Sequence, residues 1–219
     1  MYSNFTFYIS NVLSLFLNSN MPLRAGKATL FEGGVKGVGF VNGGDNVIPS
    51  KARGSSSDIL SHTVDWLPTV VNGAVGQALP ANVAFDGVSM WDTLINPEED
   101  AVWNRTTLFV DVAENGTFAG LIDGDWKYIQ GQQLYTGYFP CGKTDIPRVE
   151  KVDKWLFNLK DDPHESKNLA RENEDLVGLY EKMIAEYVVH GGYVPEQDAS
   201  VSPKAFPKLH GGVWHPWLD

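Results

Sequence analysis

The clearest hydrophobic pattern lies near the end of the chain, in residues 173–190. Asn173 is the expected N-terminal cap, and Gly191 with Gly192 is the expected end. The apolar residues recur at the spacing of an α-helix and form one stripe, namely Leu176, Val177, Tyr180, Met183, Ile184, Tyr187 and Val188. The pattern therefore predicts a helix that packs this stripe onto a sheet.

Short apolar blocks before that helix predict β-strands. They cover residues 107–112, 118–122, 126–130 and 155–159. Asn115-Gly116 lies between the first two blocks and favours a tight type I′ turn, which needs positive φ at both positions. The blocks together predict an antiparallel sheet of four strands, packed by the helix.

The first half of the chain carries weaker patterns. Residues 38–41 indicate a short buried strand, and residues 89–95 a short helix. Asp65 is the expected cap of a helix that ends at Gly73. Seven glycines in residues 26–44 indicate a backbone that turns tightly or closely approaches another group.

Composition and charge exclude several classes of protein. With 43% hydrophobic and 12% aromatic residues, the chain is too apolar to be disordered. Its net charge of −10 disfavours nucleic-acid binding. No apolar run reaches the roughly 18 residues that a bilayer requires, so we expect no membrane span. The single cysteine, Cys141, has no partner for an internal disulfide.

A few residues are candidates for chemistry. Lys27 lies on a glycine-flanked turn, where it either presents its ammonium to a tetrahedral anion or is a solvated loop lysine. Glu32 is either an acid/base group or ligand, or a hydrogen-bond partner of its own loop. We assign His62 a structural role, and we interpret Asp161 and Asp162 before a proline as an Asx turn. No Cys/His cluster has zinc spacing, so no metal site is expected.

Three Asn-x-Ser/Thr sequons occur, at Asn4, Asn104 and Asn115. They favour an extracellular or lysosomal protein, and Asn104 and Asn115 are the glycosylation candidates. Residues 1–20 are apolar but do not match a signal peptide, because no basic residue precedes Arg24.

Several blocks of the chain, in order, resemble the arylsulfatases of the type I sulfatase family, most of all the arylsulfatase B branch. They include Leu-Arg-Ala-Gly-Lys and Glu-Gly-Gly, Gly-Asp-Trp-Lys-Tyr, and Lys-Asp-Asp-Pro-His-Glu. The blocks are residues 22–40, 61–69, 86–91, 123–128, 155–165 and 212–217. Residues 1–20 do not resemble the family.

This resemblance implies an α/β fold, α+β in its C-terminal part, that is a partial alkaline-phosphatase-like sulfatase fold. We expect residues 1–20 to be a non-family segment and residues 21–105 to be a remnant of the large domain. Residues 106–219 are then the C-terminal subdomain of sheet and helix.

The resemblance also implies hydrolysis of sulfate esters, either of sulfated small molecules or of glycosaminoglycan-like substrates. In that family a cysteine of Cys-x-Pro-Ser-Arg becomes formylglycine, whose hydrate attacks sulfur. Ca²⁺ held by carboxylates and an amide polarises the sulfate, and lysine and histidine neutralise charge. Lys27 falls on the family's sulfate-contacting lysine. A lysosomal or secreted location is implied as well.

The chain departs from the family at its catalytic centre. Cys141 is followed by Gly-Lys-Thr-Asp, so the nucleophile motif is absent, and the first aspartate, Asp45, comes after the place of the family's Asp-Asn metal pair. We therefore expect the C-terminal part of a sulfatase that is inactive alone and holds no calcium alone. The alternatives are a non-catalytic extracellular module that binds sulfated glycans and, within the same superfamily, a phosphodiesterase.

Overall fold

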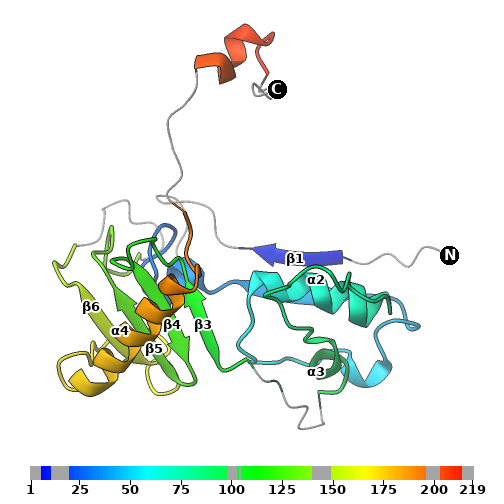
Figure 1. The fold of residues 1–219 in the computed structure, drawn as a ribbon. Coiled ribbons are helices and arrows are strands. Elements are labelled where there is room, and N and C mark those ends of the chain that lie inside the picture. Colours follow the sequence, from blue (N-terminus) through cyan, green and yellow to red (C-terminus); the bar gives the residue numbers. More distant parts are fainter. Residues whose placement is uncertain are drawn as a thin grey trace.

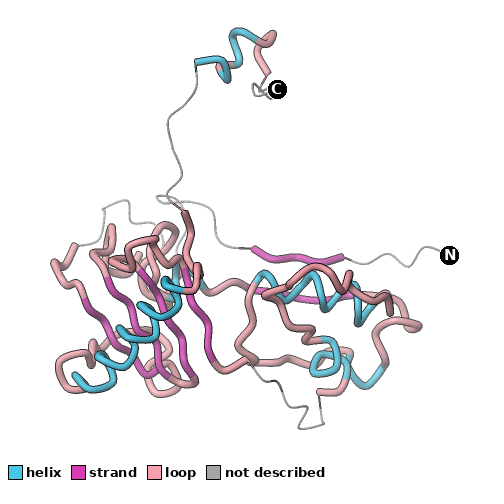
Figure 2. Tube along the Cα trace, viewed as in Figure 1, coloured by secondary structure: helices cyan, strands magenta, loops and turns pink. Residues whose placement is uncertain are grey.

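The computed structural model describes residues 6–10, 20–97, 103, 105–139, 149–195 and 203–213, with only the backbone of residues 6–10. The described residues form one sheet of four strands and one of two strands. Figures 1 and 2 show a long helix crossing the larger sheet, beside a region of short helices that contains the smaller sheet. This mixed α+β architecture confirms the expected fold class. The division into residues 1–20, 21–105 and 106–219 stays a prediction.

The sheet consists of β3 (Thr107–Val110), β4 (Ala119–Asp123), β5 (Trp126–Gln130) and β6 (Lys154–Asn158). The strands are antiparallel and follow one another in the order β3-β4-β5-β6, as the apolar blocks predicted. Leu121, Tyr128 and Leu156 lie opposite one another in the register and share one face. Residues one step along the strands point to the other face, so Lys127 and Ile129 share that second face.

The turn at Asn115-Gly116 is wider than predicted. Gly116 has a φ of +68°, but Asn115 does not have positive φ, so the turn is not type I′. The connection runs from Asp111 to Phe118 and is closed by a hydrogen bond from the Ala113 amide to the Phe118 carbonyl (2.8 Å). Asp111 has a φ of +48°, so it contributes to the reversal of chain direction that the sequence pattern placed at Asn115.

The helix α4 (Glu174–Val189) covers one face of the sheet, as predicted (Figure 1). Its buried residues Val177, Tyr180 and Ile184 join one apolar cluster with Leu121 and Leu156. Asn173 precedes the helix but does not cap it with its side chain, which donates instead to the Leu169 carbonyl (3.0 Å). Gly191, with a φ of +80°, follows its end.

A segment from the first half of the chain packs on the opposite face of the sheet. It contains the short helix α1 (Glu32–Val35), and Leu30 and Phe31 just before it are buried. Phe31 meets Trp155 and Phe157 edge-on, with ring centroids 5.3 and 6.1 Å apart. Both faces of the sheet are therefore covered, each by a segment distant in the sequence.

The strand predicted at residues 38–41 forms as β2 (Val38–Asn42), but it is not buried. Val38 is 72% exposed and Phe40 is 50% exposed. β2 pairs antiparallel with β1 (Thr6–Ser10) in a two-stranded sheet. The correction has a simple cause, because a continuous apolar run predicts a strand but not whether another element covers it.

The helical region after β2 starts three residues earlier than predicted. It begins with η2 (Thr63–Asp65), for which His62 is the cap and Asp65 the third residue, and continues through α2 (Trp66–Pro68) and η3 (Thr69–Ala74). Gly73 does not end it. A Cβ on Gly73 would lie 2.1 Å from Cγ of Trp91, so this glycine serves the close approach of α3 (Trp91–Ile95).

The other described elements are one-turn helices. They are η1 (Ser50–Ala52), η4 (Pro203–Ala205) and η5 (Pro207–Leu209). Within the described ranges the longest helix, α4, has 16 residues, and none combines the length and apolarity needed to cross a membrane.

Candidate functional site

The turn that carries Lys27 is closed by backbone contacts that require glycine. The Gly33 amide donates to the Arg24 carbonyl (2.9 Å). A Cβ on Gly33 would lie 2.3 Å from that same oxygen, and one on Gly34 would lie 2.2 Å from the Thr29 carbonyl oxygen. The high glycine density of this part of the sequence thus reflects close backbone approach, as predicted.

Lys27 lies between two residues in the left-handed region. Ala25 has a φ of +56° and Ala28 a φ of +68°. Side chains other than glycine seldom adopt this conformation, and it persists only where the surroundings hold it. The Tyr135 hydroxyl donates to the Lys27 carbonyl, which fixes the peptide from the sheet side. The Lys27 residue itself is exposed, and in the described part of the chain its ammonium forms no ion pair.

Arg24 anchors the start of the turn in an aromatic enclosure. Its guanidinium carbon lies 4.6 Å from the Trp155 ring centroid and 4.8 Å from that of Phe31, within cation–π range. Its Nε donates to the Thr136 carbonyl (2.6 Å), and its Nη1 donates to the Glu165 carbonyl (2.7 Å). The buried guanidinium therefore ties the turn to two separate loops.

Three buried charged side chains meet beneath the turn. The Lys127 ammonium, only 1% exposed as a side chain, lies 2.7 Å from Oε1 of Glu32 and 2.9 Å from Oε1 of Glu165. Oε2 of Glu165 accepts a hydrogen bond from the Glu32 amide (2.6 Å). One cation thus joins two carboxylates in the protein interior, and we name these three residues the buried charge cluster.

The buried charge cluster joins three of the motifs seen in the sequence. Glu32 comes from Glu-Gly-Gly, Lys127 from Trp-Lys-Tyr and Glu165 from Asp-Pro-His-Glu. Of these, the sequence analysis proposed only Glu32 as a chemical group, and its carboxylate proves to be neither a loop cap nor exposed to a substrate. The sequence held one signal for Lys127. It lies two residues before Ile129 on β5, so the two side chains share a face of the strand that is otherwise apolar.

Burial raises the pKa of the Glu165 carboxyl above its ordinary value, Lys127 opposes the rise and Glu32 adds to it. The folded state therefore holds this proton more tightly than the unfolded state. The bound proton therefore stabilises the folded state. This stabilisation is complete at pH values below the pKa of Glu165 in the unfolded chain, and it is lost as the pH rises through the pKa of Glu165 in the folded chain. We expect Glu165→Gln to gain stability relative to the parent chain as the pH is raised from 4 to 7, measured by urea unfolding. Parallel pH profiles for the two proteins would contradict this.

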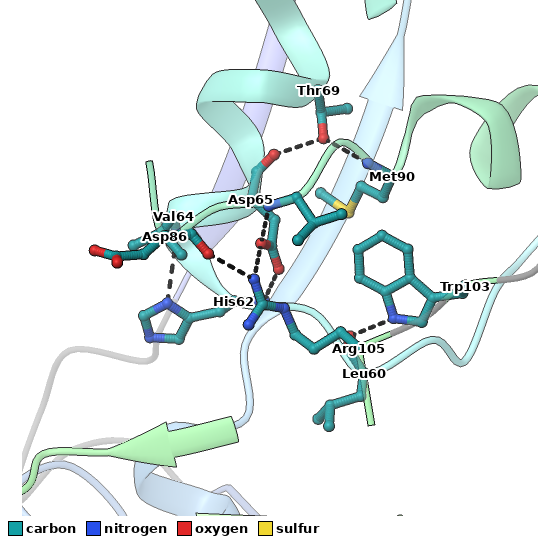
Figure 3. A network of polar contacts seen from close by, with 10 residues as sticks. Leu60, His62, Val64, Asp65, Thr69, Asp86, Met90, Trp103 and Arg105 are labelled. Carbon is teal, nitrogen blue, oxygen red and sulfur yellow. Dashed lines mark hydrogen bonds and ion pairs between the residues drawn. The ribbon is translucent and has the colours of Figure 1, made fainter. Parts of the chain in front are cut away.

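A second polar network joins two further motifs (Figure 3). The buried Asp65 carboxylate accepts from the His62 amide and the Val88 amide (both 2.8 Å) and pairs with Arg105 (2.5 Å). Arg105 also donates to the Asp86 carbonyl (3.1 Å). The Thr69 hydroxyl extends the network, because it donates to the Asp65 carbonyl (2.5 Å) and accepts from the Met90 amide (3.0 Å). Most of these contacts join side chains to backbone groups of other loops, so the network holds those loops together.

The remaining candidates take structural roles or lie elsewhere. His62 accepts a long hydrogen bond from the Val64 amide (3.5 Å) at the helix start, in line with the structural assignment. The Asx turn predicted at Asp161 and Asp162 lies earlier, at Asn158, whose Oδ1 accepts from the Lys160 amide (3.1 Å). Asp162 instead accepts from the Lys167 amide five residues on (2.9 Å). Asn104 and Cys141 lie outside the described residues.

The calcium ion of the resembled family does not fit the described residues. Nowhere among them do three or more His, Cys, Asp or Glu side chains gather to hold a metal ion. The Asp65 carboxylate already binds two backbone amides and a guanidinium, and the Glu32 and Glu165 carboxylates already bind the ammonium of Lys127. We therefore derive no chemical step through calcium for this chain.

The fold is similar to part of the alkaline-phosphatase-like fold of sulfatases. It matches the solved structure of BT33336S-sulf, reported with glycosaminoglycan metabolism by Bacteroides thetaiotaomicron, with a TM-score of 0.55 and 20% identity. That match covers 76% of this chain and 32% of the other. The crystal structure of Ps i-CgsB matches with a TM-score of 0.52 and 20% identity, over 77% of this chain and 32% of the other.

In sequence, the chain is similar to arylsulfatase J of Mus musculus. The two are 28% identical over 227 residues, which is 91% of this chain and 36% of the relative. The chain thus spans about a third of the length of the curated relative it matches. No protein-family model matches it. The resemblance to the sulfatases that the motifs indicated is confirmed by this homology.

Proposed function

We propose that residues 21–219 form the C-terminal part of an arylsulfatase-like sulfuric ester hydrolase, in which Lys27 contacts the sulfate group. One observation carries this proposal. Lys27 stands on a turn between Ala25 and Ala28, both held in the left-handed region, and presents an exposed ammonium. A solvated loop lysine needs no such support. A tetrahedral anion, by contrast, is bound best by a cation whose position is fixed beforehand.

The proposed chemistry assigns this chain a share of binding and not the whole reaction. A lysine ammonium can neutralise charge on a sulfate oxygen, but ester cleavage also needs a nucleophile. Rate enhancements of about a million-fold or more require several such groups acting together. The chain carries no Cys-x-Pro-Ser-Arg, and its described residues do not fit calcium. We propose that the purified chain binds sulfate or sulfate esters without hydrolysing them.

The substrate class follows from the same homology. We propose aryl sulfates or sulfated glycans, a class to which the glycosaminoglycan context of BT33336S-sulf lends support. The alternative function is a non-catalytic module that binds sulfated glycans. It differs from this proposal only in its biological role, which would be to bind the glycan.

The Lys27 contact has a direct test. Sodium sulfate added to the ¹⁵N-labelled chain at constant ionic strength is expected to shift the Lys27 amide resonance, and Lys27→Ala is expected to abolish saturable binding. Lys182→Ala, at an exposed lysine on α4 across the sheet from the turn, is the matched control and should bind as the parent does. An aryl sulfate incubated with the chain and calcium should release no sulfate. Saturable binding in Lys27→Ala, or measurable hydrolysis, would refute the proposal.

We propose a secreted or lysosomal location, on the basis of the sequons. Asn115 is exposed, and its Oδ1 accepts from the Thr117 hydroxyl (2.7 Å), so the sequon lies open on the connection between β3 and β4. Expressed in a eukaryotic secretory pathway behind an added signal peptide, the chain should carry a glycan at Asn115. Mass spectrometry should show one glycan fewer in Asn115→Gln. An unmodified Asn115 peptide in the secreted parent would contradict this.

A further inference from the structure

The buried charge cluster of Glu32, Lys127 and Glu165 has no role in the binding step described above, yet it lies directly under the Lys27 turn. We propose that Glu165 and Lys127 are positioning residues that fix this turn and thereby fix the place of the Lys27 ammonium. This inference rests on the proposed function, because it concerns the same lysine.

Glu165 holds the turn from both ends. Its backbone carbonyl accepts from Nη1 of Arg24 (2.7 Å), and its carboxylate accepts from the Glu32 amide (2.6 Å). Arg24 and Glu32 stand on either side of Lys27 in the sequence. One residue of a distant loop therefore clamps the two arms of the turn, and Lys27 is the exposed charged residue between them.

Lys127 holds the clamp in place. It lies on β5, a central strand with a neighbour on each side, so its backbone is among the most constrained in the sheet. Its ammonium contacts Glu32 (2.7 Å) and Glu165 (2.9 Å) and keeps the two carboxylates together despite their like charge. Lys127 thereby fixes the position of the turn relative to the sheet.

Backbone conformation supports the same inference. Glu165 has a φ of +57°, and Ala25 and Ala28 also lie in the left-handed region. This conformation is unfavourable for residues other than glycine and persists only where neighbouring contacts over-determine it. The strained residues thus occur on both partners of one contact, the turn and the loop that clamps it.

Two substitutions of Glu165 distinguish the effect of its side-chain length from the effect of its charge. Glu165→Asp keeps the charge but withdraws the carboxylate from the Glu32 amide. Glu165→Gln loses the charge and the Oε1 contact with Lys127, but its one oxygen can still accept from the Glu32 amide. For a positioning role we expect sulfate to bind about tenfold more weakly to Glu165→Asp, and within about twofold of the parent to Glu165→Gln. A purely electrostatic influence of Glu165 on bound sulfate would alter Glu165→Gln and spare Glu165→Asp.

Hydrogen exchange supplies a readout that needs no ligand. The Gly33 amide, bonded to the Arg24 carbonyl, should exchange about tenfold faster in Glu165→Asp than in the parent, through local opening of the turn. Ile184→Val is the control, because Ile184 is buried on the opposite face of the sheet and its change should leave this amide protected relative to those of the core.

The outcomes distinguish the two proposals. If Lys27→Ala binds sulfate as the parent does, or the parent binds none, the proposed function fails. If Lys27→Ala loses binding while Glu165→Asp keeps both binding and Gly33 protection, only the positioning role is overturned. Should Glu165→Asp not fold, loss of sulfate binding by folded Glu165→Gln overturns the positioning role as well.

Discussion

Lys127→Met is expected to lower the free energy of unfolding by about 3–5 kcal/mol at neutral pH, because it removes the buried cation from Glu165 and leaves Glu32 only the exposed Lys36 at 3.8 Å. Methionine fills most of the space of the lysine stem but cannot neutralise Glu32 and Glu165. Both carboxyl groups are buried, so water cannot replace the ammonium. Chemical unfolding of the full chain in urea measures the loss.

Lys154→Met is the matched control for this prediction. Lys154 lies on the neighbouring strand β6, and its ammonium pairs with Glu181 at the surface, where each side chain is well exposed. Exposed pairs contribute only about 0–1 kcal/mol, so this variant should stay close to the parent. Adding Glu32→Gln and Glu165→Gln to Lys127→Met should recover part of the loss, since no buried charge then remains. Equal stabilities of Lys127→Met and Lys154→Met would contradict the interior role of the cluster.

Asp65→Ala is expected to have an effect of similar size, about 3–5 kcal/mol, because it leaves the Arg105 guanidinium half-buried and unpaired. Nε of Arg105 is already buried without a hydrogen-bond partner, so this residue depends on Asp65 for most of its compensation. The substitution also removes the acceptor of the His62 and Val88 amides. Thermal unfolding, with hydrogen exchange at Val88 as a local readout, measures the effect.

Asp45→Ala is the control for Asp65→Ala, since Asp45 also pairs with an arginine but is 92% exposed as a side chain. Its loss should cost at most about 1 kcal/mol. Asp65→Asn should fall between the two, because its amide oxygen can still accept one backbone hydrogen bond. A Val88 amide as well protected in Asp65→Ala as in the parent would show that the carboxylate does not hold this loop.

The elements were predictable where the signal is local. The apolar stripe of α4 and the four strands of the sheet appear at the predicted places, because side-chain periodicity depends only on the segment itself. Two of the errors share one cause. The exposure of Val38 and the form of the turn at Asn115 depend on other segments, because Gln130 of β5 donates to the Gly116 carbonyl. The start of η2 is a different case, since its cap at His62 is made by local contacts that the pattern did not indicate.

The candidate site shows the same division. Lys27 was found from its glycine-flanked turn and from the family resemblance, and both signals are local. Lys127 and Glu165 were not singled out, since each stands in an ordinary strand or turn motif when considered alone. Their importance arises from contacts between segments that lie up to 141 residues apart in the sequence.

By itself, the sequence determined the helix, the four strands, the resemblance to the sulfatases and the lysine that faces a sulfate in the proposed function. Only the tertiary structure decided that Lys127, Glu165 and Asp65 are buried and which partners they meet. The physical reason is that periodicity is a property of one segment, whereas the burial of a charge depends on which other segment covers it. A charged residue can hold two segments together only when a backbone amide or an ammonium from a distant segment contacts it.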